Sequence, residues 1–234
     1  MAGKFLPARA LKLLVSAGSA RGVGKRYGLV AVMFVDIEGC TRLCEDLPPR
    51  EMNGVIESYF SEFLTVIRKS GGEVTEVLGD GLLALFEGRG LKGSIKSTFE
   101  AALQIQARTR VLNHRRHRQH DPIAVNIGLN AARALVGFTR LRDGASERWV
   151  YTATGPVTNV AARLCALATR GQILATKATA DLLPDGCECR SLGPHQLKNV
   201  TGPVEVVEIL PGGASMDVVS KGRSERHSTR RRSP

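Results

Sequence analysis

The chain has 234 residues, of which 43% are hydrophobic and 24% charged, so it can bury the core of one globular domain. No apolar run reaches the ~18 residues of a membrane helix, and no apolar segment followed by small residues marks a signal peptide, so neither is expected. The net charge of +11 gathers at residues 1–27 and 212–234 and leaves the middle nearly neutral. Because nucleic-acid-binding domains concentrate positive charge on a folded face, we expect no nucleic-acid partner.

The ends and the cysteines suggest the organisation of the chain. Residues 1–27 are expected to form a basic N-terminal segment or linker with a short helix over 7–19, residues 28–211 to form the folded domain, and residues 212–234 to form a basic, disordered tail. The five cysteines are odd in number and show no disulfide spacing, which favours a reducing compartment and therefore the cytoplasm.

The first half of the chain alternates strand and helix patterns. Residues 28–36 predict a buried strand, and apolar side chains at helical spacing predict a helix over 49–69. Two strands follow at 73–78 and 82–86, with Asp80-Gly81 as a hairpin signal between them.

The second half continues with a flexible loop at 88–93 and a long helix from 94 to about 118. Further strands are expected within 123–138 and at 148–154, separated by a polar loop at 139–147. The remaining predictions are helices at 157–168 and 176–183 and strands at 172–175, 189–192 and 204–210. This order predicts an α+β fold, a ferredoxin-like βαββαβ core with a small C-terminal α/β extension.

Two carboxylates stand out against this frame. Asp36 ends the first buried strand, where a charge is costly unless a cation meets it, and Asp80 lies in the Gly79-Asp80-Gly81 turn. Asp36 could instead cap a helix, and Asp80 could be only a turn residue. Together, two carboxylates at neighbouring strand ends can hold a pair of divalent ions, which suggests phosphoryl or nucleotidyl transfer.

Four motifs carry a family resemblance. They are FVDIEGCT (34–41), LGDGLLALF (78–86), TGPVTNVAARL (154–164) and HQLKNV (195–200). In order and spacing they resemble class III nucleotidyl cyclase catalytic domains, the adenylate/guanylate cyclase family, of bacterial type. The resemblance covers residues 28–210.

The resemblance implies a two-metal site. Asp36 and Asp80 match the metal-binding aspartates, with the Ile37 carbonyl as a further ligand, and the site would hold two Mg²⁺ or Mn²⁺ ions. The turn and helix start at residues 38–41 would offer N–H groups to phosphate. The substrate-binding residues expected from this turn and the second motif are Glu38, Gly39, Cys40, Thr41 and Gly79.

The later motifs imply the rest of the machinery. Asn159 would orient the ribose, and Arg163, four residues later on the same helix face, would stabilise charge on the α-phosphate. Lys198 would contact the triphosphate, although Asn199 replaces the glycine that usually follows it. In this family the aspartates and the Asn/Arg pair act across an interface, so the resemblance implies a head-to-tail homodimer.

The base-selecting positions disagree. Glu76 stands where adenylate cyclases commonly have lysine and guanylate cyclases glutamate, whereas Thr152 matches a bacterial adenylate subgroup. Because a hydroxyl can donate or accept, Thr152 leaves the base open. The expected function is an adenylate cyclase that uses ATP. The alternatives are a guanylate cyclase that uses GTP, and a cyclase-like module that binds nucleotide or dimerises without turnover.

Overall fold

The computed structural model describes residues 8–17, 24–40, 47–88, 90–116, 122–143 and 146–211. The expected phosphate contact of Thr41 and the expected disorder of 212–234 lie outside these residues. No helix among the described residues is both long and apolar enough to cross a membrane.

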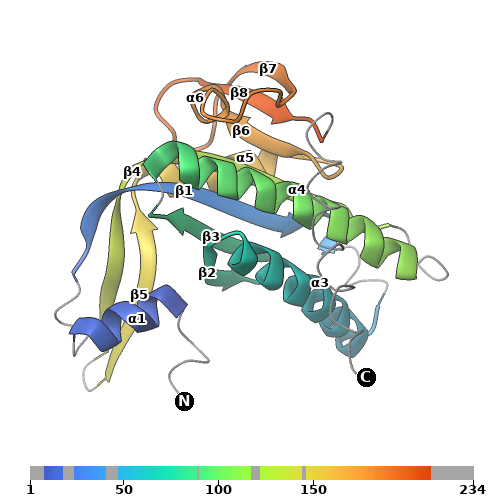
Figure 1. Cartoon of the computed structure of the whole chain (residues 1–234). Helices are drawn as coiled ribbons and strands as arrows, with labels where there is room; N and C mark the ends of the chain where they lie inside the picture. The colour runs from blue at the N-terminus through green and yellow to red at the C-terminus, as the bar shows by residue number, and fades with distance from the viewer. Residues whose placement is uncertain are drawn as a thin grey trace, which may run out of the picture.

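Eight strands of the described chain join into one sheet in the order β2-β3-β1-β4-β6-β8-β7, with β5 paired to β4 (Figure 1). The strands are β1 (Arg26–Ile37), β2 (Gly72–Leu78), β3 (Gly81–Glu87), β4 (Val125–Asp143), β5 (Ser146–Thr154), β6 (Ile173–Thr176), β7 (Cys189–His195) and β8 (Val204–Ile209). The helices are α1 (Ala8–Ala17), α3 (Pro49–Lys69), α4 (Gly90–Arg116), α5 (Pro156–Leu167) and α6 (Lys177–Ala180).

The first four strands confirm the ferredoxin-like core. They alternate with α3 and α4 as βαββαβ, and every neighbouring pair in β2-β3-β1-β4 is antiparallel. Strand β6 then adds parallel to β4 and pairs with β8, which pairs with β7, so the C-terminal extension lengthens the same sheet. The predicted fold class is therefore confirmed.

From Val30 onward strand β1 is largely buried on both faces, which explains its continuous apolar run. Its odd-numbered side chains, among them Met33 and Val35, pack in the main core with α3 and α4. Its even-numbered side chains, Val30 and Val32, pack with residues of β5 and α5 on the opposite face. Figure 1 shows α3 and α4 together in front of the sheet. Asp36, also even-numbered, thus projects on the face that α5 covers.

Two sequence predictions are wrong. Residues 139–143 continue β4 instead of forming a polar loop, because they pair with β5 along Leu135–Asp143. Aromatic contacts stabilise this hairpin, with ring centroids 5.2 Å apart for Phe138 and Tyr151 and 6.3 Å for Phe138 and Trp149. The loop expected at 88–93 is also shorter in the structure, since α4 begins at Gly90.

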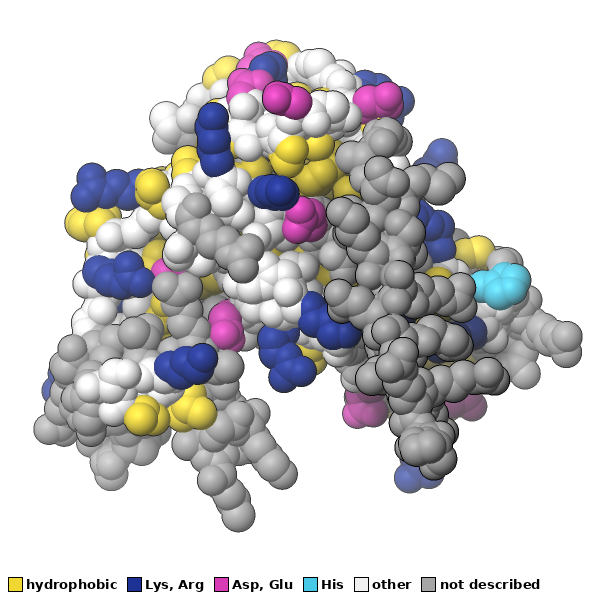
Figure 2. All heavy atoms as spheres, viewed as in Figure 1, with side chains coloured by type: hydrophobic (Ala, Val, Ile, Leu, Met, Phe, Trp, Pro, Cys, Tyr) yellow, Lys and Arg dark blue, Asp and Glu magenta, His cyan; other side chains and the backbone are white. Residues whose placement is uncertain are grey.

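Charged side chains of both signs lie on the face of the molecule that Figure 2 shows. On the face seen in Figure 2, the Lys and Arg side chains of the described residues are dispersed among Asp and Glu side chains and uncharged surface. The Lys and Arg side chains of the described residues therefore do not gather into one patch on this face.

Candidate active site

The end of β1 and the β2–β3 hairpin bring the two predicted aspartates together. Asp36 pairs with Gly81 of β3, and Leu78 pairs with the same Gly81, which leaves Gly79 and Asp80 as a two-residue loop. The Ile37 N–H donates to the Asp80 carbonyl at 3.2 Å. The second carboxylate thus lies directly beside the end of the strand that carries the first.

The hairpin loop lies one residue earlier than its sequence signal suggested. Gly79 has a φ of +64°, the left-handed conformation that glycine adopts without strain, and Gly81 already belongs to β3. Gly81 has a different role that sequence reasoning missed. A Cβ atom at this position would lie 3.3 Å from Asp36 Oδ1, so glycine leaves room for the carboxylate.

The electrostatics of the pair favour a bound cation. Burial, and then the negative charge of Asp80, raise the pKa of Asp36 from 3.8 to about 6. Behind it, burial and then the charge of Asp36 raise the pKa of the Cys165 thiol to about 12. Within the described residues neither aspartate has an ion-pair partner. Two adjacent, uncompensated carboxylates are a suitable site for a divalent cation.

The ligands present suit Mg²⁺ or Mn²⁺ bound together with a substrate. Asp36, Asp80 and the Ile37 carbonyl are all oxygen donors, which hard cations prefer. The described residues contain no group of three or more His, Cys, Asp or Glu side chains placed to hold a metal. A metal ion here would therefore take its remaining ligands from water and from phosphate oxygens of the substrate.

The turn after β1 differs from expectation at Glu38. Its N–H donates to the Ala124 carbonyl at 2.9 Å, and its carboxylate accepts hydrogen bonds from Asn126 Nδ2 and from the Arg170 N–H. The expectation that Glu38 contacts phosphate is therefore not supported, because both its amide and its carboxylate are engaged within the chain. Of the next residues, Gly39 is exposed with a φ of +71°, and Cys40 is buried.

The two base-selecting positions meet in space. Thr152 Oγ1 donates to Glu76 Oε1 at 3.2 Å, although the residues lie 76 positions apart on β5 and β2. An irregularity between Val74 and Glu76 shifts the register of β2 against β3 just before this contact. Both side chains are partly exposed, so a ligand could reach them.

The remaining candidates lie on elements other than those that carry the aspartates. Asn159 is exposed on α5, Arg163 is partly exposed one turn later, and Lys198 is exposed in the turn after β7. No hydrogen bond or ion pair within the described residues joins any of them to the aspartates. The structure thus unites Asp36 with Asp80, whereas no hydrogen bond or ion pair of the described residues joins Asn159, Arg163 or Lys198 to them.

Comparisons with known proteins identify the family and the fold. A family model described as "Adenylate and Guanylate cyclase catalytic domain" matches residues 23–210. The uncharacterized protein Rv1318c of Mycobacterium tuberculosis is 30% identical over 183 residues, which cover 76% of this chain and 32% of that protein. The chain therefore spans about a third of the length of the curated relatives it matches.

Solved structures share the fold. The adenylyl cyclase CyaB from P. aeruginosa has a TM-score of 0.73 at 24% identity, over 80% of this chain and 95% of that one. The guanylyl cyclase Cya2 has a TM-score of 0.71 at 24% identity, over 83% and 98% of the two chains. Since one neighbour is named for each nucleotide, the fold leaves the base undecided.

Proposed function

The chain belongs to the family of adenylate and guanylate cyclase catalytic domains, and we propose that it converts ATP to 3′,5′-cyclic AMP and pyrophosphate. The observation that carries the proposal is the pair of adjacent carboxylates, Asp36 and Asp80, which has no cationic partner among the described residues. We place the catalytic domain at residues 28–211, between the basic segments 1–27 and 212–234. The cysteine usage and a nucleoside triphosphate substrate favour the cytoplasm.

Each residue has a definite task in this reaction. Asp36, Asp80 and the Ile37 carbonyl would hold two Mg²⁺ or Mn²⁺ ions, which supply activation of the ribose 3′-hydroxyl and neutralise charge on the triphosphate. The backbone N–H groups that follow Glu38 in the turn after β1 would donate to phosphate oxygens.

The cationic and amide side chains would act on the other parts of the substrate. The guanidinium of Arg163 would donate to an α-phosphate oxygen as charge develops there, since its planar fork matches phosphate geometry. The Asn159 amide would fix the ribose, and the Lys198 ammonium would attract the triphosphate.

The separation of these groups supports a dimer. Because Asn159 and Arg163 make no hydrogen bond or ion pair to the aspartates within the described residues, a head-to-tail pair of chains would complete each site from two protomers. The test mixes Asp36→Ala and Arg163→Ala chains, each inactive alone. Mixed dimers should regain up to about a quarter of the wild-type activity, because one composite site per heterodimer is intact and half of a random mixture is heterodimer. Mixtures that stay inactive although heterodimers form would contradict the shared site.

The Glu76–Thr152 contact supports adenine. Oε1 of Glu76 already accepts from Thr152, and Oε2 has no partner among the described residues. One free acceptor suits the single N6 amino group of adenine, whereas guanine presents both N1–H and N2–H to a carboxylate. Guanylate cyclase is the second candidate, since rotation of the Thr152 hydroxyl would release both oxygens of Glu76.

The deciding experiment measures turnover of ATP and GTP side by side, with Mn²⁺ and with Mg²⁺, and with Asp36→Ala as the control. Cyclic AMP that disappears in the control supports the proposal. Cyclic GMP as the main product would establish the second candidate. If neither product forms at a concentration where the chain is dimeric, the domain is a binding module and the proposed activity is wrong.

A further inference from the structure

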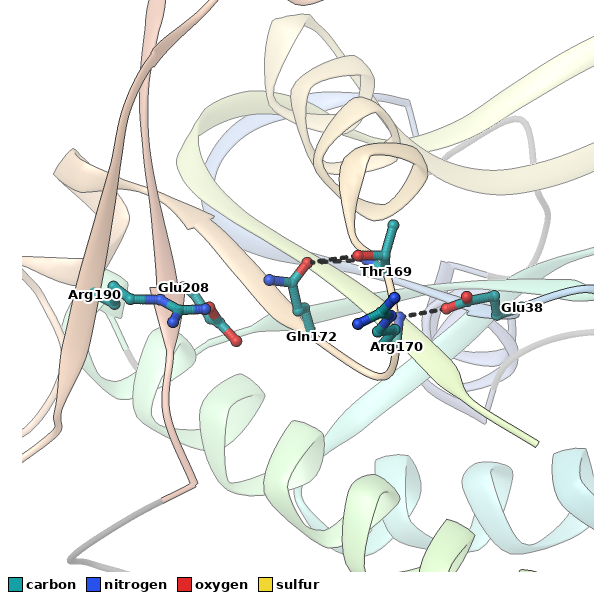
Figure 3. A pocket seen from close by; sticks show the side chains of 6 residues that line it. All are labelled: Glu38, Thr169, Arg170, Gln172, Arg190 and Glu208. Carbon is teal, nitrogen blue, oxygen red and sulfur yellow. Dashed lines mark hydrogen bonds and ion pairs between the residues drawn. The ribbon is translucent and has the colours of Figure 1, made fainter. Parts of the chain in front are cut away.

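A pocket of about 560 Å³ opens beside the end of β1, next to the α5–β6 turn. Figure 3 shows the six side chains that line it: Glu38, Thr169, Arg170, Gln172, Arg190 and Glu208. The Glu38 carboxylate points across this space to the backbone of Arg170. The pocket wall therefore contains a direct bridge between the strand that carries Asp36 and the segment that follows α5.

The bridge consists of three hydrogen bonds. Oε2 of Glu38 accepts from Nδ2 of Asn126 at 3.1 Å and from the Arg170 N–H. Oδ1 of Asn126 accepts from the Gly171 N–H at 3.0 Å. The side chains of Glu38 and Asn126 thus accept hydrogen bonds from the consecutive backbone amides of Arg170 and Gly171. We call Glu38, Asn126, Arg170 and Gly171 the clamp.

The turn is shaped for these bonds. Arg170 has a φ of +53° and Gly171 a φ of +80°, so both residues are left-handed. A non-glycine residue pays a conformational penalty there and persists only where the surroundings hold it. Gln106 of α4 adds a further restraint, because its Nε2 donates to the Gly171 carbonyl at 2.9 Å. The turn at Arg170 and Gly171 is thus held by specific contacts from the residue after β1, from β4 and from α4.

The clamp meets the candidate active site at Asn126. This residue is 5% exposed and lies directly opposite Asp36 in the β1–β4 register, while Glu38 lies two residues beyond Asp36. Past Ile37, β1 has no further ladder bonds in the described chain, and the Glu38 N–H bond to Ala124 is its next backbone contact. The Asp36 carboxylate and the Ile37 carbonyl therefore lie within two residues of the clamp.

We propose that Glu38 and Asn126 are positioning residues that fix the metal-binding end of β1 against the segment following α5, the helix that carries Asn159 and Arg163. The inference rests on the proposed function, since it assigns Glu38 to orienting metal ligands instead of binding phosphate. One chain then connects its aspartates rigidly to its own Asn/Arg helix. In a head-to-tail dimer this connection runs from one composite site to the other.

The test compares three substitutions at Glu38 in the full chain. Glu38→Ala removes the acceptor, Glu38→Asp keeps the charge but is too short to reach both donors, and Glu38→Gln keeps an acceptor oxygen without the charge. Glu208→Ala is the matched control, because Glu208 lines the same pocket and pairs with Arg190 in the extension. Two quantities are measured: Mn²⁺ binding by electron paramagnetic resonance without turnover, and the Mn²⁺ concentration for half-maximal cyclase activity.

Loss of an outer partner of a metal site typically weakens metal binding by 10–100-fold, so we expect about tenfold weaker Mn²⁺ binding for Glu38→Ala and Glu38→Asp. Glu38→Gln and Glu208→Ala should stay within about twofold of the wild type. Wild-type Mn²⁺ affinity in Glu38→Ala would overturn the proposal. Equal weakening of Mn²⁺ binding in Glu38→Gln and Glu38→Ala would also overturn it, because loss of the negative charge alone would then explain the effect. If Mn²⁺ binding follows the expected pattern but no chain forms cyclic nucleotide, the clamp stands and the proposed activity fails.

Discussion

Replacing Asp36 with asparagine should stabilise the metal-free protein while abolishing its activity. Burial and the Asp80 charge favour the protonated carboxyl, so the folded pKa is about 6 against 3.8 for an ordinary aspartate. This difference corresponds to about 3 kcal/mol of destabilisation when the group is ionised. Because Asp36 is only half-buried, solvent screening reduces the figure, and we expect about 1.5 kcal/mol.

The sign of the pH dependence follows from linkage. Above about pH 6 both the folded and the unfolded chains hold Asp36 ionised, so the full penalty applies; below about pH 4 both are protonated and it vanishes. The advantage of Asp36→Asn should therefore be largest near pH 8 and fade as the pH falls through this window.

The assay is urea unfolding of both proteins with EDTA at several pH values, with Asp185→Asn, an exposed aspartate before β7, as the control. Mn²⁺ should raise the unfolding temperature of the wild type and leave that of Asp36→Asn unchanged. The reasoning is refuted if Asp36→Asn is less stable than the wild type at pH 8, or if the difference between them does not change with pH.

Three further substitutions test the packing around the site. Gly128→Ala should cost about 1–3 kcal/mol in urea unfolding and reduce turnover, because the new methyl group would overlap the backbone of α5; unchanged stability would show that α5 can move freely. Gly81→Ala should lower Mn²⁺-induced thermal stabilisation, since its Cβ would press on Asp36 Oδ1 at 3.3 Å, and an unchanged shift in the unfolding temperature would contradict this. Tyr151→Phe should cost about 1–2 kcal/mol, because its hydroxyl donates to the buried Glu87 carboxylate at 2.7 Å; equal midpoints of unfolding would count against it.

Local patterns were sufficient to predict most of the core. The apolar run ending at Asp36 predicted β1, and a helical repeat that starts after Pro48 and stops before Ser70 predicted α3 with the bounds 49–69 that the structure has. Such signals depend on neighbours in the sequence, where burial and backbone preference act together. The order of these elements then limited the sheet to few topologies, and the ferredoxin-like one is confirmed.

The contacts that sequence patterns missed all depend on distant partners. The polar residues of 139–143 form a strand only because β5 pairs with them. Glu38 was expected to bind phosphate because of its place in the first motif. Its contact with the Arg170 amide could not be predicted, because that amide lies 132 positions away and a backbone group leaves no side-chain signal in the sequence. The contact of Thr152 with Glu76 likewise produces no periodic pattern in the sequence, although both residues were identified as base-selecting positions.

The two-residue loop of the β2–β3 hairpin determines where this chain tolerates changes in length. Side chains alternate between the two faces of a strand, so one extra residue between Leu78 and Gly81 would either bulge the hairpin or turn one strand over. Either change would carry Asp80 away from Asp36. The far end of the β4–β5 hairpin, beyond Leu141, has no link to the aspartates among its described contacts and is the better place for an inserted tag or sensor peptide.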